Sequence, residues 1–454
     1  MSEPRRVHLL TLGCPKNRVD SEVMLGVLAR GGHELVLDPA AADVLVVNTC
    51  SFIGPAKEES IDAILDMARV KAERPGRRLV VTGCLAQRYA DELRDALPEV
   101  DVFVGTGDLL RIADAVEAPA AEGPVVYRGA QHVLPRRELA ERVRTGAWWT
   151  AYLKVSEGCD HRCSFCIIPK IRGRHESRPM DDLLDEAARL AAEGVVELNL
   201  IAQDLTAYGR DRRDGTSLAT LLHGLALRAP SVRWLRLLYA YPSSVTDDLL
   251  EVMATEPAIC KYLDMPLQHI TDGMLRAMRR ERSGAAIRRL LARIRRAVPG
   301  IALRSSFIVG FPGETEDDVR ALCDFLAEAE FERVGVFAYS NEENTAAATL
   351  PGQVPEGDKH ERRARVMEAQ ARIAARRAAA QVGTIVDVLV EGTRGRGLVG
   401  RTRTQAPEID GVVTLDRGAA PGDLARACIT GADTYDLRGV LVENAQDAQN
   451  AKRD

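Results

Sequence analysis

Short apolar runs alternate with amphipathic stretches over about the first 120 residues. The apolar runs are rich in Val and Leu and predict strands, and the stretches between them carry apolar residues at helical spacing. The predicted strands are 7–12, 44–47 and 79–81, and the predicted helices are 19–30, 56–69 and 88–96. This alternation predicts an N-terminal α/β domain with a doubly wound parallel sheet.

The same alternation of strands and helices returns after residue 147. The predicted strands are 148–155, 195–201, 234–239, 262–265, 301–310 and 333–339. Repeated βα units of this kind predict a complete or partial (β/α) barrel, with its active site at the carboxyl ends of the strands. The segment 118–146 contains Ala, Pro and the basic run Pro135–Arg137, and it is interpreted as a linker, the alternative being a disordered spacer.

The pattern changes near the C-terminus. Residues 358–381 are rich in Ala and Arg and predict one long helix with a solvated basic face. Short β-branched runs separated by Gly-containing turns follow, which is typical of a small antiparallel β-barrel; they are 385–390, 397–400, 412–415 and 424–429. The polar tail 444–454 predicts disorder. We therefore expect three domains, at 5–120, 145–378 and 379–446.

Composition restricts the function classes. The chain is 46% hydrophobic and 28% charged, as in soluble globular proteins, and 4% aromatic, which gives no sign of a stacking platform for nucleic acid. The N-terminal apolar run lacks a cleavage-site pattern and is too short to span a bilayer, so we expect a cytoplasmic protein without membrane attachment. The net charge of -5 argues against a generally basic, phosphate-binding surface.

Nine cysteines form an odd set, and six of them lie at predicted strand ends or in one short loop. This distribution indicates thiolate ligation in a reducing compartment, not a disulfide framework. The other three, Cys260, Cys323 and Cys428, are interpreted as small buried apolar residues.

The most informative motif is C-x3-C-x2-C at Cys159, Cys163 and Cys166, which supplies three thiolates and no fourth. Three thiolates can hold three irons of a cubic 4Fe-4S cluster and leave the fourth iron open to the amino and carboxylate groups of S-adenosylmethionine. One-electron reduction of that sulfonium releases a 5'-deoxyadenosyl radical, which abstracts hydrogen from an unactivated carbon. The alternative is a zinc knuckle completed by His161 or a distant cysteine. Phe165 is suited to pack near the adenine.

A second set of cysteines follows the predicted strands of the first domain. Cys14, Cys50 and Cys84 each come directly after a strand, about 35 residues apart. Because the carboxyl ends of parallel strands form one crevice, we expect the three thiols to converge on one site. Three ligands without an evident fourth again suggest a cluster with an open iron, the alternative being buried core cysteines.

The loop of Cys159 resembles the cluster loop of the radical S-adenosylmethionine enzymes, and together with residues 167–179 it resembles that of the methylthiotransferases. The whole chain resembles this family: a three-cysteine domain, a radical S-adenosylmethionine barrel and a TRAM domain. The resemblance implies S-adenosylmethionine and two 4Fe-4S clusters. It assigns Cys159, Cys163 and Cys166 to the radical-generating cluster, and Cys14, Cys50 and Cys84 to an auxiliary cluster that holds the sulfur to be inserted.

Two branches of the family compete. One modifies adenosine in transfer RNA, and the other, the RimO family, modifies the β-carbon of an aspartate in small-subunit ribosomal protein S-twelve. The strings that resemble the RimO family are 12–17, 201–204, 239–242 and 262–269. The resemblance implies ribosomal protein S-twelve or the small ribosomal subunit as partner, and an electron donor such as flavodoxin or ferredoxin. Transfer RNA is a partner only under the alternative.

The charge of the third domain bears on this choice. Between residues 383 and 444 the sequence has nine acidic side chains, Asp410 and Asp416 among them, and seven basic ones. An RNA-binding barrel should instead be clearly basic. An acidic face would attract a basic ribosomal protein. The alternative is that these acids are only a solvated surface. A hypothesis of another class is a non-catalytic module with structural clusters that only docks on ribosomes.

Further residues are candidates for cofactor binding. Gln203 and Asp204, at a strand end, could hold the methionine moiety of the cofactor, or they form a polar loop that closes the strand. Residues 306–315 resemble the adenine-contacting strand of the superfamily. Within them Gly310 permits close backbone approach, although Gly313 and Glu314 could merely start a helix.

Three more residues are candidates near the substrate or the auxiliary site. Lys16 and Asn17 could hydrogen-bond the auxiliary cluster or its sulfur, with helix initiation at Asn17 as the simpler alternative. His269 could orient the substrate aspartate, the alternative being a structural histidine.

Overall fold

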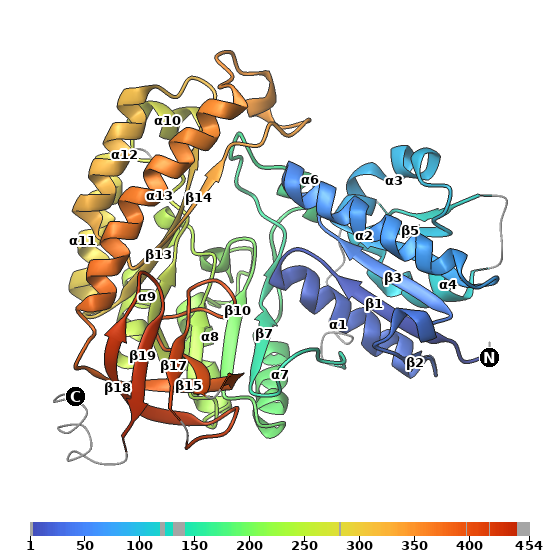
Figure 1. The fold of residues 1–454 in the computed structure, drawn as a ribbon, viewed down its shortest axis with the longest axis horizontal. Helices are drawn as coiled ribbons and strands as arrows, with labels where there is room; N and C mark the ends of the chain where they lie inside the picture. Colours follow the sequence, from blue (N-terminus) through green and yellow to red (C-terminus); the bar gives the residue numbers. More distant parts are fainter. Residues whose placement is uncertain are drawn as a thin grey trace.

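The computed structural model describes residues 3–118, 123–129, 141–280, 283–395, 397–416 and 418–442. Part of the predicted linker and the predicted disordered tail lie outside these residues, as do Arg396, Arg417 and Glu443. Figure 1 shows an N-terminal domain beside a larger central domain, with the C-terminal strands packed against one end of the central sheet. Within the described ranges, no helix has the length and apolar character needed to cross a bilayer.

The N-terminal domain is a six-stranded parallel sheet in the order β2-β1-β3-β4-β5-β6. Its strands are β1 (Arg6–Thr11), β2 (Glu34–Leu35), β3 (Val44–Thr49), β4 (Arg78–Gly83), β5 (Val102–Val104) and β6 (Val125–Tyr127). Its helices are α1 (Pro15–Arg30), α2 (Gly54–Ala72), α3 (Cys84–Ala96) and α4 (Ile112–Glu117), with 3-10 turns η1 (Pro39–Ala41) and η2 (Thr106–Arg111). The three predicted strands are confirmed as β1, β3 and β4.

Alternate side chains of the central strand β3 enter two different cores. Val44 and Val46 pack with α1 and α4, whereas Leu45 and Val47 pack with α2 and α3. Because side chains alternate across a strand, a β-strand covered by helices on both faces is apolar at every position. The sheet is therefore doubly wound, as predicted.

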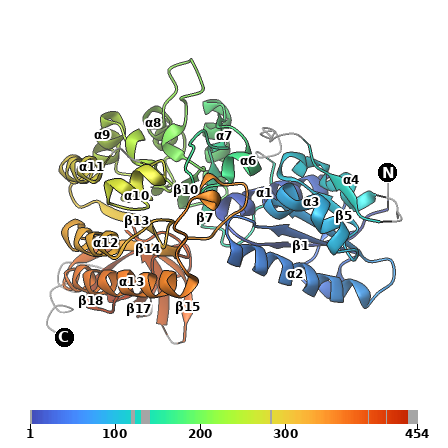
Figure 2. The ribbon, with the colours of Figure 1, turned by 90° about the horizontal axis from the view of Figure 1, so that it is seen from above.

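The central domain is a six-stranded parallel sheet in the order β14-β13-β12-β11-β10-β7, so the predicted barrel is partial. The strands are β7 (Thr150–Lys154), β10 (Glu197–Ile201), β11 (Trp234–Leu237), β12 (Ile259–Asp264), β13 (Ala302–Val309) and β14 (Arg333–Ala338). Figure 2 shows helices arranged around the outer side of these strands. They are α7 (Met180–Ala192), α8 (Leu218–Arg228), α9 (Asp247–Thr255), α10 (Asp272–Ala277), α11 (Gly284–Ala297), α12 (Glu316–Ala329) and α13 (Glu356–Ala379).

Short elements complete the central domain around the cysteine loop. Strands β8 (Ser156–Glu157) and β9 (Glu176–Ser177) pair with each other, and helix α6 (Ile168–Arg172) lies between them in sequence. The remaining 3-10 turns are η3 (Leu205–Ala207), η4 (Pro242–Ser244) and η5 (Ala346–Thr349). The loop therefore leaves the sheet at the carboxyl end of β7, as predicted.

The C-terminal strands form a closed five-stranded barrel in the order β15-β16-β17-β19-β18. They are β15 (Ile385–Arg394), β16 (Gly397–Thr402), β17 (Val413–Leu415), β18 (Leu424–Ala432) and β19 (Leu437–Leu441). The predicted small antiparallel β-barrel is confirmed, with one exception among its strand pairs, since β17 and β19 run parallel. The sequence analysis missed β19, and without it the barrel cannot close.

Buried charges join this barrel to the amino-terminal end of the central sheet. Glu197, the first residue of β10, is fully buried and binds Arg401 of β16 at 2.6 Å and Arg236 of β11 at 2.9 Å. Asp410 accepts a hydrogen bond from Tyr262 at 2.5 Å and lies 3.4 Å from Arg304. Since these contacts lie at the amino-terminal ends of strands, the barrel packs away from the cysteine loop.

Candidate functional site

The auxiliary cysteines follow three neighbouring strands. Cys14 follows β1, Cys50 follows β3 and Cys84 opens α3 directly after β4. These strands are adjacent in the sheet, with Thr11 opposite Asn48 and Thr49 opposite Gly83. A Cβ on Gly13, the residue before Cys14, would lie 3.2 Å from Cys50 Sγ, and Asn17, three residues after Cys14, has its Oδ1 3.7 Å from Cys84 Sγ. The structure therefore brings Cys14, Cys50 and Cys84 together, as the sequence predicted.

Two glycines allow this close approach. Gly13 has φ +89°, and a Cβ there would lie 2.8 Å from Cys50 Cβ. Gly83 has φ +96°, and a Cβ there would lie 2.3 Å from Asn48 Oδ1. A side chain at either position would have to displace the loop that carries the neighbouring cysteine.

Helix α1 begins at this site without a side-chain cap. Its N-cap residue is Cys14, so the interpretation of Asn17 as the helix initiator was wrong. The Asn17 amide instead donates to the backbone carbonyls of Leu12 at 3.0 Å and Thr49 at 2.9 Å, tying two cysteine-bearing loops together. Its Oδ1 faces Cys84 Sγ at 3.7 Å.

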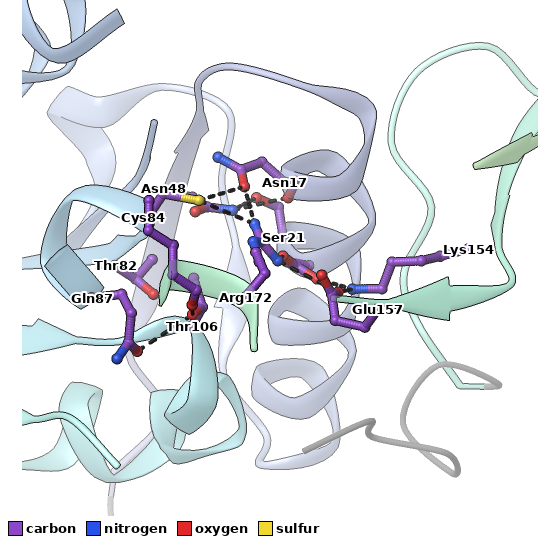
Figure 3. A network of polar contacts seen from close by, with 12 residues as sticks. Asn17, Ser21, Asn48, Thr82, Cys84, Gln87, Thr106, Lys154, Glu157 and Arg172 are labelled. Atoms are coloured by element: carbon purple, nitrogen blue, oxygen red, sulfur yellow. Dashed lines mark hydrogen bonds and ion pairs between the residues drawn. The ribbon is translucent and has the colours of Figure 1, made fainter. Parts of the chain in front are cut away.

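A buried polar network connects the auxiliary site to the central domain (Figure 3). Arg172, at the end of α6, donates to Cys84 Sγ at 3.4 Å and to Asp20 Oδ2 at 2.5 Å. Asp20 also accepts from Lys154 at 2.6 Å, and Lys154 in turn donates to Glu157. Although burial alone would raise the pKa of Asp20, Lys154 and Arg172 lower it, so its carboxylate is charged.

A second contact closes the junction from the other side. Glu342, after β14, lies 2.8 Å from Arg88 and 2.9 Å from Lys57. Arg88 also donates to the carbonyl of Ser51, next to Cys50. Two sets of contacts, the network around Arg172 and the ion pairs of Glu342, thus hold the auxiliary site against the central domain.

The loop of the second cysteine set is fixed by backbone contacts. Gly158 has φ +75°, and a Cβ there would lie 2.0 Å from the carbonyl oxygen of Arg174. Cys159 N–H donates to the Gly173 carbonyl, and Cys166 N–H donates to the Cys163 carbonyl, each at 3.1 Å. Ser164, inside the loop, donates to the Ala277 carbonyl at 2.7 Å. The loop therefore has a defined shape before any metal is considered.

Burial raises the pKa of four of the six thiols, two in each set. Burial raises the pKa of Cys159 to about 11 and that of Cys166 to about 12. Burial raises the pKa of Cys84 to about 12, against the opposing effect of Arg172, and it also raises the pKa of Cys50. Because iron is bound by thiolates, occupation of these sites must release protons.

A column of stacked side chains lies beside Cys163. The rings of His161 and Tyr241 are stacked, with 3.5 Å between their centroids. The guanidinium carbon of Arg280 lies 4.1 Å from the centroid of the Tyr241 ring. Arg280 donates to Cys163 Sγ at 3.6 Å, and His161 Nε2 lies 2.7 Å from Asp204 Oδ2. Since His161 is engaged with Asp204 and Tyr241, the structure does not support it as the fourth ligand of a zinc knuckle.

The predicted cofactor residues differ in what they contact. Gln203 donates to Glu157 through Nε2, while its Oε1 is buried without a hydrogen-bond partner among the described residues. Asp204 is the N-cap of η3 and also accepts from the Thr206 hydroxyl at 2.6 Å. Burial acts to raise the pKa of Asp204, but hydrogen bonds from His161 and Thr206 lower it. Gln203 thus keeps a free acceptor, whereas the Asp204 carboxylate is occupied.

A cavity of ≈ 630 Å³ opens beside the loop, within the size range of small-molecule sites. Its wall includes Cys159, His161, Asp204, Arg174 and Arg210. Phe165, Gln203 and Gly310 do not line it. Phe165 instead packs against the cluster of Met274, Met278, Phe311, Tyr339 and Ala347.

Gly310 and His269 both contact other parts of the protein in ways that indicate a structural role. A Cβ on Gly310, which has φ +70°, would lie 2.3 Å from Lys359 Cγ, and its N–H donates to Glu314 at 2.6 Å. The close approach that this glycine permits is therefore to helix α13. His269 is fully buried, accepts from the Ile270 N–H at 2.9 Å and lies 3.3 Å from Glu314, which favours the structural alternative.

Asp410 and Asp416, the two acids singled out on the third domain, differ in exposure. Asp410 is 2% exposed and is committed to Tyr262 and Arg304 of the central domain. Two exposed acids have basic neighbours, since Asp387 lies opposite Arg426 on the paired strand and Asp433 binds Arg438 at 2.7 Å. The exposed Asp416 instead accepts a hydrogen bond from the Leu441 N–H at 2.9 Å. The use of Asp410 as a solvated docking residue was wrong because the charge is buried in a domain interface.

Sequence reasoning missed Arg172, Lys154 and Asp20. Asp20 and Lys154 lie on predicted elements and Arg172 follows the cysteine loop, but their pairing depends on how the two domains dock. The available signal was the position of charged residues in otherwise apolar surroundings, such as Lys154 between Leu153 and Val155. Buried charges of this kind are rare unless they are paired.

The donor sets fit iron–sulfur clusters. Each set presents three free thiols. In the parts of the chain that the structure describes, no group of three or more His, Cys, Asp or Glu side chains is arranged around a single metal ion. The ligands of a cubic cluster bind different irons and need not converge on one point.

Comparisons with known proteins agree with this architecture. Three family models match: Uncharacterized protein family UPF0004 over residues 6–105, Radical SAM superfamily over 153–326 and TRAM domain over 382–442. Among solved structures, the radical S-adenosylmethionine methyltransferase TsrM from Kitasatospora setae aligns with a TM-score of 0.54 and 18% identity, over 74% of this chain and 72% of that chain. These matches define a radical S-adenosylmethionine fold with two added domains.

Curated relatives are similar over nearly the whole length. Ribosomal protein uS12 methylthiotransferase RimO from Anaeromyxobacter sp. (strain Fw109-5) is 53% identical over 99% of this chain and 95% of its own. The protein of the same name from Geobacter sulfurreducens is 49% identical over 96% of this chain and 98% of its own. The chain belongs to the RimO family of ribosomal protein uS12 methylthiotransferases.

Proposed function

We propose that this enzyme places a methylthio group on the β-carbon of an aspartate of ribosomal protein uS12. The observation that carries the proposal is the pair of three-thiol sites at one domain junction. The curated relatives that match nearly the whole chain are uS12 methylthiotransferases. The two sites lie at the carboxyl ends of two parallel sheets and are joined by the network of Arg172, Asp20 and Lys154.

The cofactors are S-adenosylmethionine and 4Fe-4S clusters. Cys159, Cys163 and Cys166 hold the radical-generating cluster, and a second set holds the auxiliary cluster; that set is Cys14, Cys50 and Cys84. When bound, the first cluster would supply the electron for reductive cleavage of S-adenosylmethionine, and the second would hold the sulfur atom to be inserted. The proposed domain boundaries are 5–120 for the auxiliary-cluster domain, 145–378 for the radical S-adenosylmethionine domain and 379–446 for the TRAM domain.

Residues of the chain bind and orient the cofactor. Gln203 Oε1 accepts from the ammonium of the methionine moiety, since it is a buried acceptor with no partner among the described residues. Asp204 acts as a positioning residue through His161, because its oxygens are already bonded. Phe165 packs near the adenine, and Gly310 shapes the strand end behind it.

The partners follow from the reaction. The substrate is uS12, free or in the small ribosomal subunit, and an electron donor such as flavodoxin or ferredoxin reduces the cluster. A cytoplasmic location follows from a ribosomal substrate. Transfer RNA modification is the weaker alternative, because the full-length relatives carry the uS12 name.

Mass spectrometry of ribosomal proteins tests the proposal. The uS12 aspartate should carry a methylthio group in cells with the gene, lose it on deletion and regain it on complementation. Nucleoside analysis of transfer RNA from the same strains is the control and should not change. Loss of a methylthio nucleoside with unmodified uS12 throughout would overturn the proposal in favour of the transfer RNA alternative.

A further inference from the structure

Lys16 is a buried cation without a carboxylate partner. Its side chain is 8% exposed, and among the described residues no carboxylate oxygen lies within ion-pair distance of its ammonium. The other two buried lysines are paired, Lys154 with Asp20 and Glu157, and Lys359 with Glu356. A buried charge usually requires a counter-ion, so the surroundings of Lys16 are incomplete as the chain stands.

The position of Lys16 indicates what is missing. It lies two residues after Cys14, and its ammonium sits 3.2 Å from the ring centroid of Tyr239. Tyr239 follows β11 at the carboxyl end of the central sheet and has φ +67°, a backbone conformation that non-glycine residues rarely adopt. The ammonium is therefore held on the aromatic face, between the auxiliary site and the mouth of the partial barrel.

The proposed substrate brings an anion to this place. In an aspartate side chain the β-carbon that accepts the methylthio group is bonded directly to the carboxylate. When that carbon lies between the two cysteine sets, its carboxylate must lie there too. The nearby cations Arg172 and Lys154 are already neutralised by Asp20 and Glu157.

We propose that Lys16 binds the side-chain carboxylate of the substrate aspartate and thereby selects an acidic residue as substrate. The proposal rests on the proposed function, because it requires an aspartate as the modified residue. Tyr239 holds the ammonium in place before the substrate arrives, which lowers the cost of ordering a flexible lysine side chain.

A double-mutant cycle tests this pairing. Binding to the cluster-loaded full-length enzyme, without reductant, is measured for uS12 and for uS12 with the target aspartate changed to Asn. The enzyme should prefer the aspartate form by about 10- to 100-fold, as for a hydrogen bond to a charged group. Lys16→Met should abolish this preference while binding the Asn form as well as the unaltered enzyme does.

Matched variants separate the pairing from other roles. Lys16→Arg should keep part of the preference, and Lys71→Met, which removes a partly buried lysine that pairs with Asp101 in the same domain, should keep all of it. If Lys16→Met loses auxiliary iron, Lys16→Gln makes the same cycle with a polar neutral side chain. Equal weakening of both uS12 forms, or an unchanged preference, overturns the proposal and assigns Lys16 to the auxiliary cluster or to domain docking.

The outcome is distinguishable from failure of the proposed function. If the unaltered enzyme produces no methylthio group on uS12, the proposed function fails whatever the cycle shows. If it modifies uS12 and the cycle shows no coupling, only the role of Lys16 fails.

Discussion

The guanidinium of Arg172 lies 3.4 Å from Cys84 Sγ, although the two residues belong to different domains. Arg172 ends helix α6, six residues after the last cysteine of the radical loop, whereas Cys84 begins α3 of the first domain. The same guanidinium also binds Asp20. One side chain therefore fixes a ligand of the auxiliary site relative to the loop of the other site.

The first prediction concerns the reduction potential of the auxiliary cluster. Removing the cation with Arg172→Met should lower this potential by on the order of 100 mV, since a unit charge about 4 Å away contributes ~4 kcal/mol at an effective dielectric constant of 20 and Asp20 offsets part of it. Redox titration followed by electron paramagnetic resonance measures the shift, in a background that lacks the radical-loop cysteines. Arg174→Met removes an exposed arginine nearby and is the control. An unchanged potential with Arg172→Met would limit Arg172 to docking the domains.

The second prediction concerns the independence of the two clusters. Replacing Cys159, Cys163 and Cys166 with Ala should leave about half of the iron and sulfide, because the other ligands lie on a separate sheet. Iron and sulfide analysis after anaerobic reconstitution measures this. Complete loss of cluster absorbance from a folded variant would show that the sites assemble together.

The third prediction separates the roles of the clusters. Cys14→Ala, Cys50→Ala and Cys84→Ala should each still cleave S-adenosylmethionine reductively, because the radical loop is intact, and should form no methylthio product. Chromatography of 5'-deoxyadenosine and mass spectrometry of uS12 give the two readouts. Normal product formation by these variants would contradict the role assigned to the auxiliary cluster.

The sequence predicted what local pattern and topology determine. The cysteines after β1, β3 and β4 were predicted to meet because adjacent parallel strands end at one edge, and the structure brings their loops together there. Contacts between domains were not predictable in this way. Arg172 with Cys84 and Lys16 with Tyr239 depend on domain docking, and no spacing in the sequence encodes that.

Elements with few residues were missed for a related reason. Strands β2 and β5 have two and three residues, too few to show a period. Strand β19 contains a glycine and an arginine in five residues, and its burial depends on its neighbours β17 and β18. Asp410 was misread because an acid in a small barrel is usually solvated, whereas here the barrel covers the end of another sheet.

The fourth prediction concerns the acid stability of the interface between the central domain and the barrel. Burial alone would raise the pKa of Glu197, but Arg401 and Arg236 lower it to about 2, from an ordinary value of 4.5. A lowered pKa contributes stability that is present above pH 4.5 and is lost as the pH falls toward 2. Glu197→Gln should therefore be less stable than the unaltered protein at neutral pH, and the difference should shrink below pH 4.5.

Urea unfolding at several pH values measures this difference. Glu193→Gln is the control, because Glu193 is exposed and its pair with Arg144 should contribute less than about 1 kcal/mol. A difference that stays constant from pH 7 to pH 3 would show that the carboxylate charge of Glu197 does not stabilise the interface.

The fifth prediction follows from the burial of Asp410. Its carboxylate lies beside Tyr262 and Arg304, and it also accepts from the Ala406 N–H at 2.9 Å. Asp410→Asn should lower the free energy of unfolding by about 1–3 kcal/mol, because it removes a buried carboxylate and leaves the partly buried Arg304 with only Asp264 as counter-ion. Asp433→Asn, which breaks an exposed pair with Arg438, should change it by less than about 1 kcal/mol. Salt should change this loss of stability little, since a buried pair is poorly screened. If Asp410 instead docked uS12 from an exposed face, Asp410→Asn would weaken uS12 binding at unchanged stability, and that weakening would shrink as salt is raised.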